Sequence, residues 1–277
     1  MIKIKGKLFD LKKKRIMGIL NLTPDSFYDG GKLKSVEELL SKAANMIQEG
    51  ADILDVGGYS SRPGAAHISV SEELNRIIPA ILEIKKKFPD SIISVDTFRS
   101  KVAEEAIRSG ADIINDISAG DLDPRLPELM AEANVPYIIM HMQGTPANMQ
   151  QNPNYSNITN ALLSYFSDKL NLFNKMGIND IIIDPGFGFG KNSVHNYEIL
   201  NKLSLFDIFQ TPVLVGLSRK SMIYNSLQTT AENALNGTSI LNTIALLNGA
   251  SILRVHDVKE AVEAIKLVDL YLNPNKQ

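Results

Sequence analysis

Short apolar runs, most of them rich in Ile, Leu and Val, recur along the whole chain. They read IMGIL, DILDVG, SIISVDT, DIINDI, PYIIMHM, DIIIDPG, PVLVGLS and SILRVHD. Most of these runs are continuously apolar rather than alternating, which is typical of parallel strands that are covered on both faces. The pattern therefore predicts eight buried parallel strands, spread from one end of the chain to the other.

Segments with helical spacing lie between these runs. Residues 71–87, for example, repeat Leu and Ile at intervals that form one stripe of a helix. The other predicted helices cover residues 35–49, 100–109, 158–176, 231–248 and 258–272. Because strands and helices alternate without a composition break or a Pro/Gly/Ser linker, we expect a single (β/α)8 barrel domain over residues 1–277.

An open doubly wound sheet is the structural alternative to the barrel, since it is built from the same alternation of strands and helices. The stretch MIKIKGKLFDL, which precedes the first barrel strand, alternates around Gly6. It predicts a short N-terminal β-hairpin that closes the bottom of the barrel.

Polar residues cluster at the carboxyl ends of the predicted strands. They are Asn21, Asp55, Asp96, Asn115, Asp184, Ser218 with Arg219 and Lys220, and Arg254 with His256. In a barrel these ends converge on one face, where active sites lie. Any single Asp or Asn there has a simpler explanation as a turn-former or helix N-cap, but the joint placement favours an active site. The long loops NLTPDSFYDGG, GYSSRPGAAH and QGTPANMQQNPNY follow strands on the same face and are candidate lids.

Composition narrows the classes of function. With 277 residues, 44% of them apolar, the chain can bury a large core, and its net charge of −2 lacks the basic excess of a general nucleic-acid binder. The absence of cysteine excludes a disulfide framework, a thiolate metal site and a nucleophilic thiol. The N-terminus has no signal-peptide core and no apolar run is long enough to span a bilayer, so we expect a cytoplasmic protein that binds neither membrane nor nucleic acid.

The carboxylate of Asp184 follows three isoleucines and therefore faces a largely apolar barrel mouth. A buried carboxylate needs a partner with parallel N–H donors, which either Arg254 or the guanidine-like edge of a ligand supplies. Asp96 and Asn115 add a second carboxylate and an amide, so the group suits a flat heterocycle with several N–H groups. A structural ion pair between Asp184 and Arg254 is the alternative.

Cationic residues on the same face suit a phosphate or pyrophosphate. They are Arg62, Arg219, Lys220, Arg254 and His256. Asn21 offers a hard oxygen to Mg²⁺. GFGFGK, residues 186–191, does not have the P-loop spacing and is better suited to bringing backbone close to a flat ligand. We expect His67 and His195 on the surface and His141 as a satisfied polar group at a strand end.

These motifs closely resemble those of the dihydropteroate synthases, the folate-pathway enzymes that sulfonamides inhibit. The matching stretches are MGILNLTPDSFYDGG, ILDVGGYSSRPGA, SVDTFRSKVAEEAIRSGADIINDISAG, YIIMHMQGTPANMQ, IIIDPGFGFGK, GLSRKSMI and RVHDV. The resemblance implies a transferase that condenses 6-hydroxymethyl-7,8-dihydropterin pyrophosphate with p-aminobenzoate to give 7,8-dihydropteroate and pyrophosphate. It also implies Mg²⁺ as cofactor and a homodimer.

The resemblance assigns roles by motif position. Residues that would hold the pterin are Asp96, Asn115, Asp184 and Lys220, and Arg254 would stack on its ring. The catalytic residues at the departing pyrophosphate would be Arg62, Lys220, Arg254 and His256, with Asn21 as a ligand of Mg²⁺. Residues that would surround p-aminobenzoate are Phe27, Ser61, Pro63, Lys220 and Ser221.

The chain departs from the family pattern in the second loop, where GGYSSRPG replaces the usual GGESTRPG. Tyr59 removes a charge and Ser61 loses a methyl group, so we expect altered binding of p-aminobenzoate or sulfonamides. A methyltetrahydrofolate-dependent methyltransferase and a non-catalytic pterin-binding protein are the alternative functions. Neither would need the complete anion-binding set, which this sequence retains.

Overall fold

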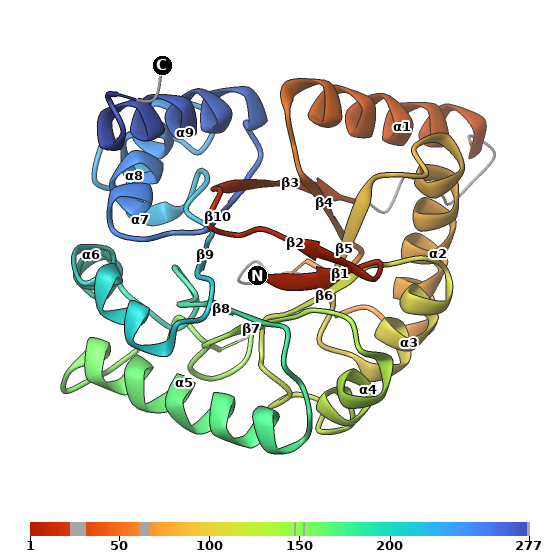
Figure 1. Cartoon of the computed structure of the whole chain (residues 1–277), viewed down its shortest axis with the longest axis horizontal. Coiled ribbons are helices and arrows are strands. Elements are labelled where there is room, and N and C mark those ends of the chain that lie inside the picture. The colour runs from red at the N-terminus through yellow and green to blue at the C-terminus, as the bar shows by residue number, and fades with distance from the viewer. Residues whose placement is uncertain (23–31, 61–66, 147, 152, 276–277) are drawn as a thin grey trace.

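Parallel strands form a ring inside a layer of helices in the computed structural model of this chain, which describes residues 1–22, 32–60, 67–146, 148–151 and 153–275 (Figure 1). The strands are β3 (Arg15–Asn21), β4 (Ile53–Gly57), β5 (Ile92–Asp96), β6 (Ile113–Asp116), β7 (Tyr137–Met140), β8 (Ile181–Asp184), β9 (Leu214–Val215) and β10 (Ile252–Val255). They pair in the order β8-β7-β6-β5-β4-β3-β10-β9, and every pair is parallel.

The two ends of this sheet meet between β8 and β9. They are joined by the isolated parallel bridge between Ile183 and Val213, and the Ile183 N–H donates to the Pro212 carbonyl at 3.0 Å. The order therefore follows the sequence around a nearly closed ring, which confirms the predicted (β/α)8 barrel and makes the doubly wound alternative wrong.

The outer layer contains the helices that the sequence predicted, with slightly different bounds, and further helices that it did not predict. They are α1 (Lys32–Glu49), α2 (Val70–Lys87), α3 (Ser100–Arg108), α4 (Arg125–Ala133), α5 (Ile158–Lys175), α6 (Ser193–Asn201), the 3-10 helix η2 (Leu203–Phe209), α7 (Ser221–Tyr224), α8 (Leu235–Leu247) and α9 (Val258–Leu272). Of these, α4, α6, η2 and α7 were not predicted. None of the helices in the described ranges has the length and hydropathy needed to cross a bilayer.

The N-terminal hairpin lies across the amino ends of the strands (Figure 1). Its strands β1 (Ile2–Ile4) and β2 (Lys7–Phe9) are antiparallel. Ile2 and Ile4 are buried in a cluster made by the first inward-facing residues of the barrel strands, among them Ile53 and Ile252. The hairpin therefore closes the bottom of the barrel, as predicted.

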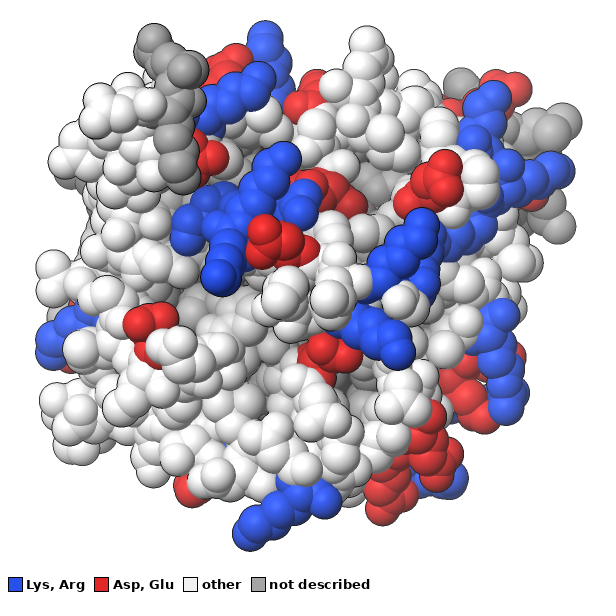
Figure 2. Space-filling view, viewed as in Figure 1, with Lys and Arg blue, Asp and Glu red and all other residues white. Residues whose placement is uncertain are grey.

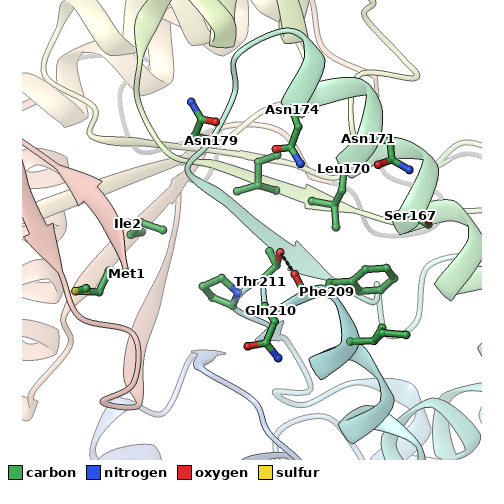
Figure 3. A pocket seen from close by; sticks show the side chains of 13 residues that line it. Met1, Ile2, Ser167, Leu170, Asn171, Asn174, Asn179, Phe209, Gln210 and Thr211 are labelled. Carbon is green, nitrogen blue, oxygen red and sulfur yellow. Dashed lines mark hydrogen bonds between the residues drawn. The ribbon is translucent and has the colours of Figure 1, made fainter.

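The bottom face also carries much of the exposed positive charge. Lys and Arg side chains gather around the hairpin in Figure 2, and Lys3, Lys5 and Lys7 of the hairpin are exposed. A cavity of about 350 Å³ lies beside Met1 and Ile2, lined by amide side chains such as Asn174 (Figure 3). None of the predicted site residues lines this cavity.

Strand periodicity places the polar strand-end residues inside the barrel. Successive strand side chains point to opposite faces, so residues two positions apart share a face. Asp55 follows the inward-facing Ile53 by two residues, as Arg254 follows Ile252, and Asp184 follows Ile182. A carboxylate, an amide or a guanidinium thus stands directly above the apolar layer at the carboxyl ends of several strands.

Candidate active site

Arg254 is the centre of a charged cluster inside the barrel mouth. Its Nε donates to Asp55 Oδ2 at 2.6 Å, and its Nη2 donates to Asp96 Oδ2 at 2.7 Å. The amide of Asn115 donates to the same Asp55 oxygen at 3.1 Å. Within the described ranges the other oxygen of Asp55, Oδ1, is buried without a hydrogen-bond partner. Residues from β4, β5, β6 and β10 are therefore held in one network.

Burial sets the electrostatics of this cluster. It raises the pKa of Asp96 to about 7, while the neighbouring Arg254 guanidinium acts in the opposite direction. Burial also lowers the pKa of Lys220 to about 8, opposed by the Asp184 carboxylate. Because both carboxylates and cations are withdrawn from water, each charge depends strongly on its neighbours.

Asp184 forms no ion pair with Arg254 in the part of the chain that the structure describes, because Arg254 is engaged by Asp55 and Asp96. The Asp184 Oδ1 atom accepts a hydrogen bond from the Gly186 N–H at 2.8 Å. Burial raises the pKa of Asp184, and the strongest opposing influence is the charge of Lys220. This geometry speaks against the structural ion pair and leaves the carboxylate available to a ligand with N–H donors.

Lys220 lies between β9 and α7, beside the segment Gly186–Lys191. Its Nζ donates to the Phe187 carbonyl and lies 4.8 Å from the centre of the Phe189 ring. Ser221 follows it as the first residue of α7 and is exposed. The ammonium thus joins the strand-end cluster to an aromatic side chain, which suits a flat ligand between them.

The loops after β9 and β10 are tied together by side chains. Ser218 Oγ lies 2.9 Å from His256 Nδ1 and also accepts the His256 backbone N–H at 3.2 Å. Next to them, Arg219 donates to both carboxylate oxygens of Asp257 at 2.9 and 2.8 Å. Its Nη1 also donates to backbone carbonyls, including that of Ala231 at 2.9 Å. Arg219 therefore acts as a link between loops, whereas the sequence placed it with the anion-binding cations.

Comparisons with known proteins identify the family of this chain. The chain matches the family described as pterin binding enzyme over residues 17–256. It is 45% identical to the dihydropteroate synthase of Escherichia coli K12 over 270 residues, which cover 97% of this chain and 95% of that one. The chain belongs to the dihydropteroate synthase family.

Solved structures of dihydropteroate synthases show the same fold. A Yersinia pestis dihydropteroate synthase in complex with a sulfonamide drug has a TM-score of 0.91 and 40% identity, with 99% of each chain covered. A Xanthomonas albilineans dihydropteroate synthase with 4-aminobenzoic acid has a TM-score of 0.89 and 35% identity over 98% of this chain and 97% of that one.

Asn21, the predicted metal ligand of this dihydropteroate synthase family member, is exposed at the end of β3. Its Oδ1 lies beside Gly57 of β4, 3.4 Å from the point where a Cβ on that glycine would stand. No group of three or more His, Cys, Asp or Glu side chains among the described residues is placed to hold a metal ion. Asn21 alone is a weak ligand, so a magnesium ion here would need oxygens from a substrate, as is usual for Mg²⁺ at phosphates.

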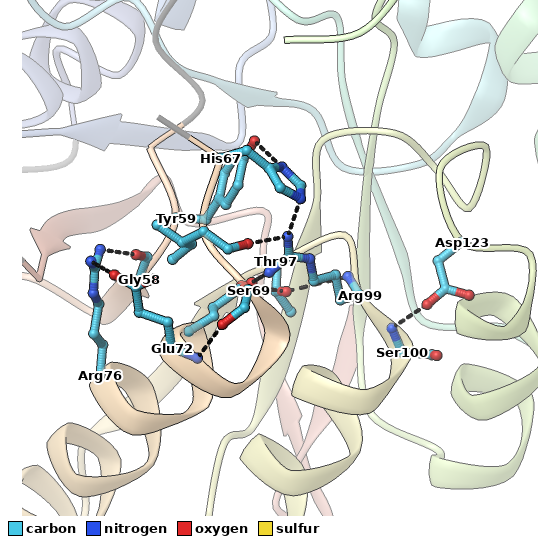
Figure 4. Close-up of polar contacts among 12 residues, drawn as sticks. Gly58, Tyr59, His67, Ser69, Glu72, Arg76, Thr97, Arg99, Ser100 and Asp123 are labelled. Carbon is cyan, nitrogen blue, oxygen red and sulfur yellow. Dashed lines mark hydrogen bonds and ion pairs between the residues drawn. The ribbon is translucent and has the colours of Figure 1, made fainter. Parts of the chain in front are cut away.

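Four predicted site residues lie outside the described residues: Phe27, Ser61, Arg62 and Pro63. The ends of the second loop are described. Figure 4 shows Tyr59 and His67 pointing toward each other, with Tyr59 Oη 3.3 Å from His67 Nδ1. Arg99 lies 5.3 Å from the centre of the Tyr59 ring and donates to the buried Glu73 at 2.7 Å. Tyr59, one of the two residues that depart from the family pattern, is thus in contact with His67 and Arg99.

Two further functional features escaped the sequence interpretation. Asp55 was recognised as a strand-end residue but received no role, although it accepts hydrogen bonds from both Arg254 and Asn115. Lys191 was given no role at all, yet it is buried beside the predicted pterin site. The position of Asp55 at a strand end was a usable signal, whereas nothing in the sequence distinguishes Lys191 from a surface lysine.

Proposed function

We propose that this chain condenses 6-hydroxymethyl-7,8-dihydropterin pyrophosphate with p-aminobenzoate, forming 7,8-dihydropteroate and releasing pyrophosphate. The observation that carries the proposal is the Asp184 carboxylate, which is buried at the barrel mouth and forms no ion pair with Arg254 in the described ranges. Two N–H groups on the guanidine-like edge of a pterin match its acceptors. Identity to dihydropteroate synthases along the whole chain supports the same reaction.

The pterin would lie between the strand-end cluster and the segment after β8. Asp184 and Asn115 would bond its ring edge, and Lys220 would bond its acceptors. Arg254 is held by Asp55 and Asp96 at 2.6 and 2.7 Å. Its planar guanidinium would stack on the ring and reach the anion.

The chemistry needs no strong general base. An arylamine is unprotonated at neutral pH, so its nitrogen can attack the methylene carbon directly while the bond to the pyrophosphate oxygen breaks. The nitrogen then loses one proton to water or to the departing pyrophosphate. The difficult part is stabilising the negative charge on the departing pyrophosphate. Arg62, Lys220, Arg254 and His256 would donate to that charge, and electron donation by the dihydropterin would favour a dissociative path.

Magnesium is proposed as the cofactor. When bound, Mg²⁺ would stabilise negative charge on the pyrophosphate oxygens. Asn21 would hold it together with substrate oxygens and water. Phe27, Ser61, Pro63, Lys220 and Ser221 would surround p-aminobenzoate, the first three in segments that the structure does not describe.

A homodimer is proposed as the assembly. The neighbouring helices α8 and α9 carry exposed apolar stripes at helical spacing. The α8 stripe contains Ile240, Ile244 and Leu247, and the α9 stripe contains Leu267, Leu270 and Tyr271. Apolar faces of this kind are typical of interfaces between subunits. We also propose, from the sequence, that the protein is cytoplasmic and that its ligands are small molecules.

The decisive experiment measures product formation. The purified protein is incubated with the pterin pyrophosphate and Mg²⁺, with and without p-aminobenzoate, and pyrophosphate and dihydropteroate are quantified. We expect both products only when p-aminobenzoate is present. Binding of the pterin without any p-aminobenzoate-dependent product would favour the non-catalytic binding protein instead. Methyl transfer from methyltetrahydrofolate would favour the methyltransferase.

A further inference from the structure

The backbone carbonyls of residues 186–190 all accept hydrogen bonds from side chains. Lys191 Nζ donates to Gly186 and Phe189 at 2.9 and 3.0 Å. Lys220 donates to Phe187, Gln150 to Gly188, and Tyr155 to Gly190, the last at 3.0 Å. A loop in which each successive carbonyl has a side-chain donor is held far more firmly than a solvent-exposed turn.

Lys191 supplies more of these bonds than any other side chain. It is only 2% exposed, and its Nζ also donates to the His141 carbonyl at 3.1 Å. His141 Nδ1 lies 3.0 Å from the same Nζ. Because burial lowers the pKa of His141 to about 3, its ring is neutral, and an unprotonated Nδ1 accepts a hydrogen bond from the lysine by sharing one of the three ammonium N–H groups with a carbonyl. The single ammonium therefore joins the segment after β8 to the end of β7.

The two segments are packed too closely to slide. Gly186 has φ +73°, and a Cβ on it would lie 2.1 Å from the His141 carbonyl oxygen. Gly190 has φ +63°, and a Cβ there would lie 2.6 Å from the Gln143 carbonyl oxygen. Glycine is the residue that tolerates both the left-handed backbone and this close approach. The carbonyls of Gly186 and Phe189 are thereby placed within hydrogen-bond distance of the buried lysine.

The position of Asp184 depends on this arrangement. Its Oδ1 is bonded to the Gly186 N–H at 2.8 Å, and the Gly186 carbonyl is bonded to Lys191 at 2.9 Å. A shift of Gly186 would therefore move the carboxylate that faces the ligand. Positions of binding groups matter at the scale of an ångström or less.

We propose that Lys191 is a positioning residue of the pterin site: its buried ammonium holds residues 186–190 against His141 and thereby fixes Asp184 for the ligand. This inference rests on the proposed function, in which Asp184 binds the pterin. Lys191 itself does not touch the ligand, since its Nζ is enclosed by protein acceptors on the far side of the segment.

The charge of Lys191 gives the inference a second, pH-dependent readout. Burial lowers the pKa of Lys191 to about 7, and the nearby Asp184 carboxylate opposes this. The charged and titratable groups that face it are Asp184 on β8, His141 after β7, Lys220 before α7 and His195 on α6. Above pH 7 the amine has fewer protons to donate, so the segment loses part of its support.

The experiment compares Lys191→Met with Lys85→Met by calorimetric titration of the pterin pyrophosphate. Lys85 is a matched control, since it donates to the Ser91 carbonyl and Asp112 at 2.7 and 2.6 Å on the opposite face of the barrel. Both variants should melt at a lower temperature than the wild type. For Lys191→Met alone we expect a roughly 10- to 100-fold rise in the Kd of the pterin, because buried acceptors lose their donor.

Tyr155→Phe removes a single anchor from the same segment, at the Gly190 carbonyl, and keeps the proposal testable if Lys191→Met does not fold. It should raise the Kd by about threefold, the effect of one modest hydrogen bond. The ratio of the Lys191→Met Kd to the wild-type Kd should fall as pH rises through 7.

Failure of the inference and failure of the proposed function give different results. If the wild-type protein does not bind the pterin pyrophosphate, the proposed function is wrong. If the wild type binds it and Lys191→Met and Tyr155→Phe bind it equally well, the positioning role is wrong. Equal losses of affinity in Lys191→Met and Lys85→Met would also overturn it, because they would reflect general destabilisation.

Discussion

Replacing Asp184 by Asn separates a ligand-binding carboxylate from a structural one. The amide keeps the size of the side chain, and its oxygen can still accept the Gly186 N–H that now lies 2.8 Å from Oδ1. Its NH₂ group, however, faces the ligand with donors where the pterin edge also presents donors. The variant therefore removes the acceptor function while leaving the packing of β8 intact.

The expected loss of affinity follows from the bonds involved. Hydrogen bonds to a charged group contribute about 1.5–3 kcal/mol each. Two such bonds from the pterin edge would amount to about 3–6 kcal/mol, or roughly a 10²- to 10⁴-fold rise in Kd. Asp180→Asn is a suitable control, because Asp180 lies before the opposite end of β8 and accepts the Lys3 N–H at 3.1 Å.

The stability of the free protein should change in the opposite direction. Burial raises the pKa of Asp184, so ionising this carboxyl opposes folding at pH values above its unfolded pKa. The wild type therefore loses stability as pH rises from the unfolded pKa through the folded one, and Asp184→Asn does not. We expect the variant to be as stable as the wild type or more so at pH 8, with the difference shrinking in acid.

Isothermal titration with the pterin pyrophosphate measures the affinity, and urea unfolding at several pH values measures the stability. Near-wild-type affinity would refute the assignment of Asp184 to the pterin. A large fall in unfolding free energy at pH 8, on the order of the 3–5 kcal/mol that follows from breaking a buried ion pair, would show a structural role instead.

Three other perturbations address the cofactor, the altered loop and the assembly. Removing Mg²⁺ with EDTA should abolish turnover but leave the melting temperature unchanged, because no cluster among the described residues is placed to hold a metal alone; a large shift in melting would contradict this. Tyr59→Glu combined with Ser61→Thr should change the KM for p-aminobenzoate and the sulfonamide inhibition constant by several-fold, and unchanged constants would sink the idea. Ile244→Lys places a charge in the α8 stripe and should reduce the mass in light scattering from a dimer to the 30.5 kDa monomer; an unaltered mass would place the interface elsewhere.

The barrel was predictable because its signal is repeated in every strand. Continuous apolar runs appear wherever a strand is covered on both faces, and most of them are followed by a helical pattern. The missed helices lack that pattern: α4 carries Pro127 near its start, and α6 follows a glycine-rich segment. His195, expected on the surface, is half-buried and accepts the Asn192 N–H in a capping box at the start of α6.

The site was predictable only as far as strand ends reveal it. The sequence predicts that four charged residues share one face: Asp55, Asp96, Asp184 and Arg254. It does not show which of the carboxylates form ion pairs with the Arg254 guanidinium. The pairing depends on distances across the ring of strands, and in the structure Arg254 pairs with Asp55 and Asp96. Lys191 was beyond sequence reasoning for another reason: lysine is rarely buried, and its acceptors are carbonyls turned inward by the backbone of neighbouring glycines.

The ring of strands closes at the junction of β8 and β9. Few backbone bonds cross it, yet Asp184 ends one strand and Lys220 follows the other. A pterin held by both side chains would connect the two strands across the junction at the barrel mouth. Amide hydrogens near this junction should therefore exchange faster than those of β4 in the free protein and slow most on binding. Binding of the substrate would then stabilise the barrel that recognises it, and amide exchange at the junction would report whether the site is occupied.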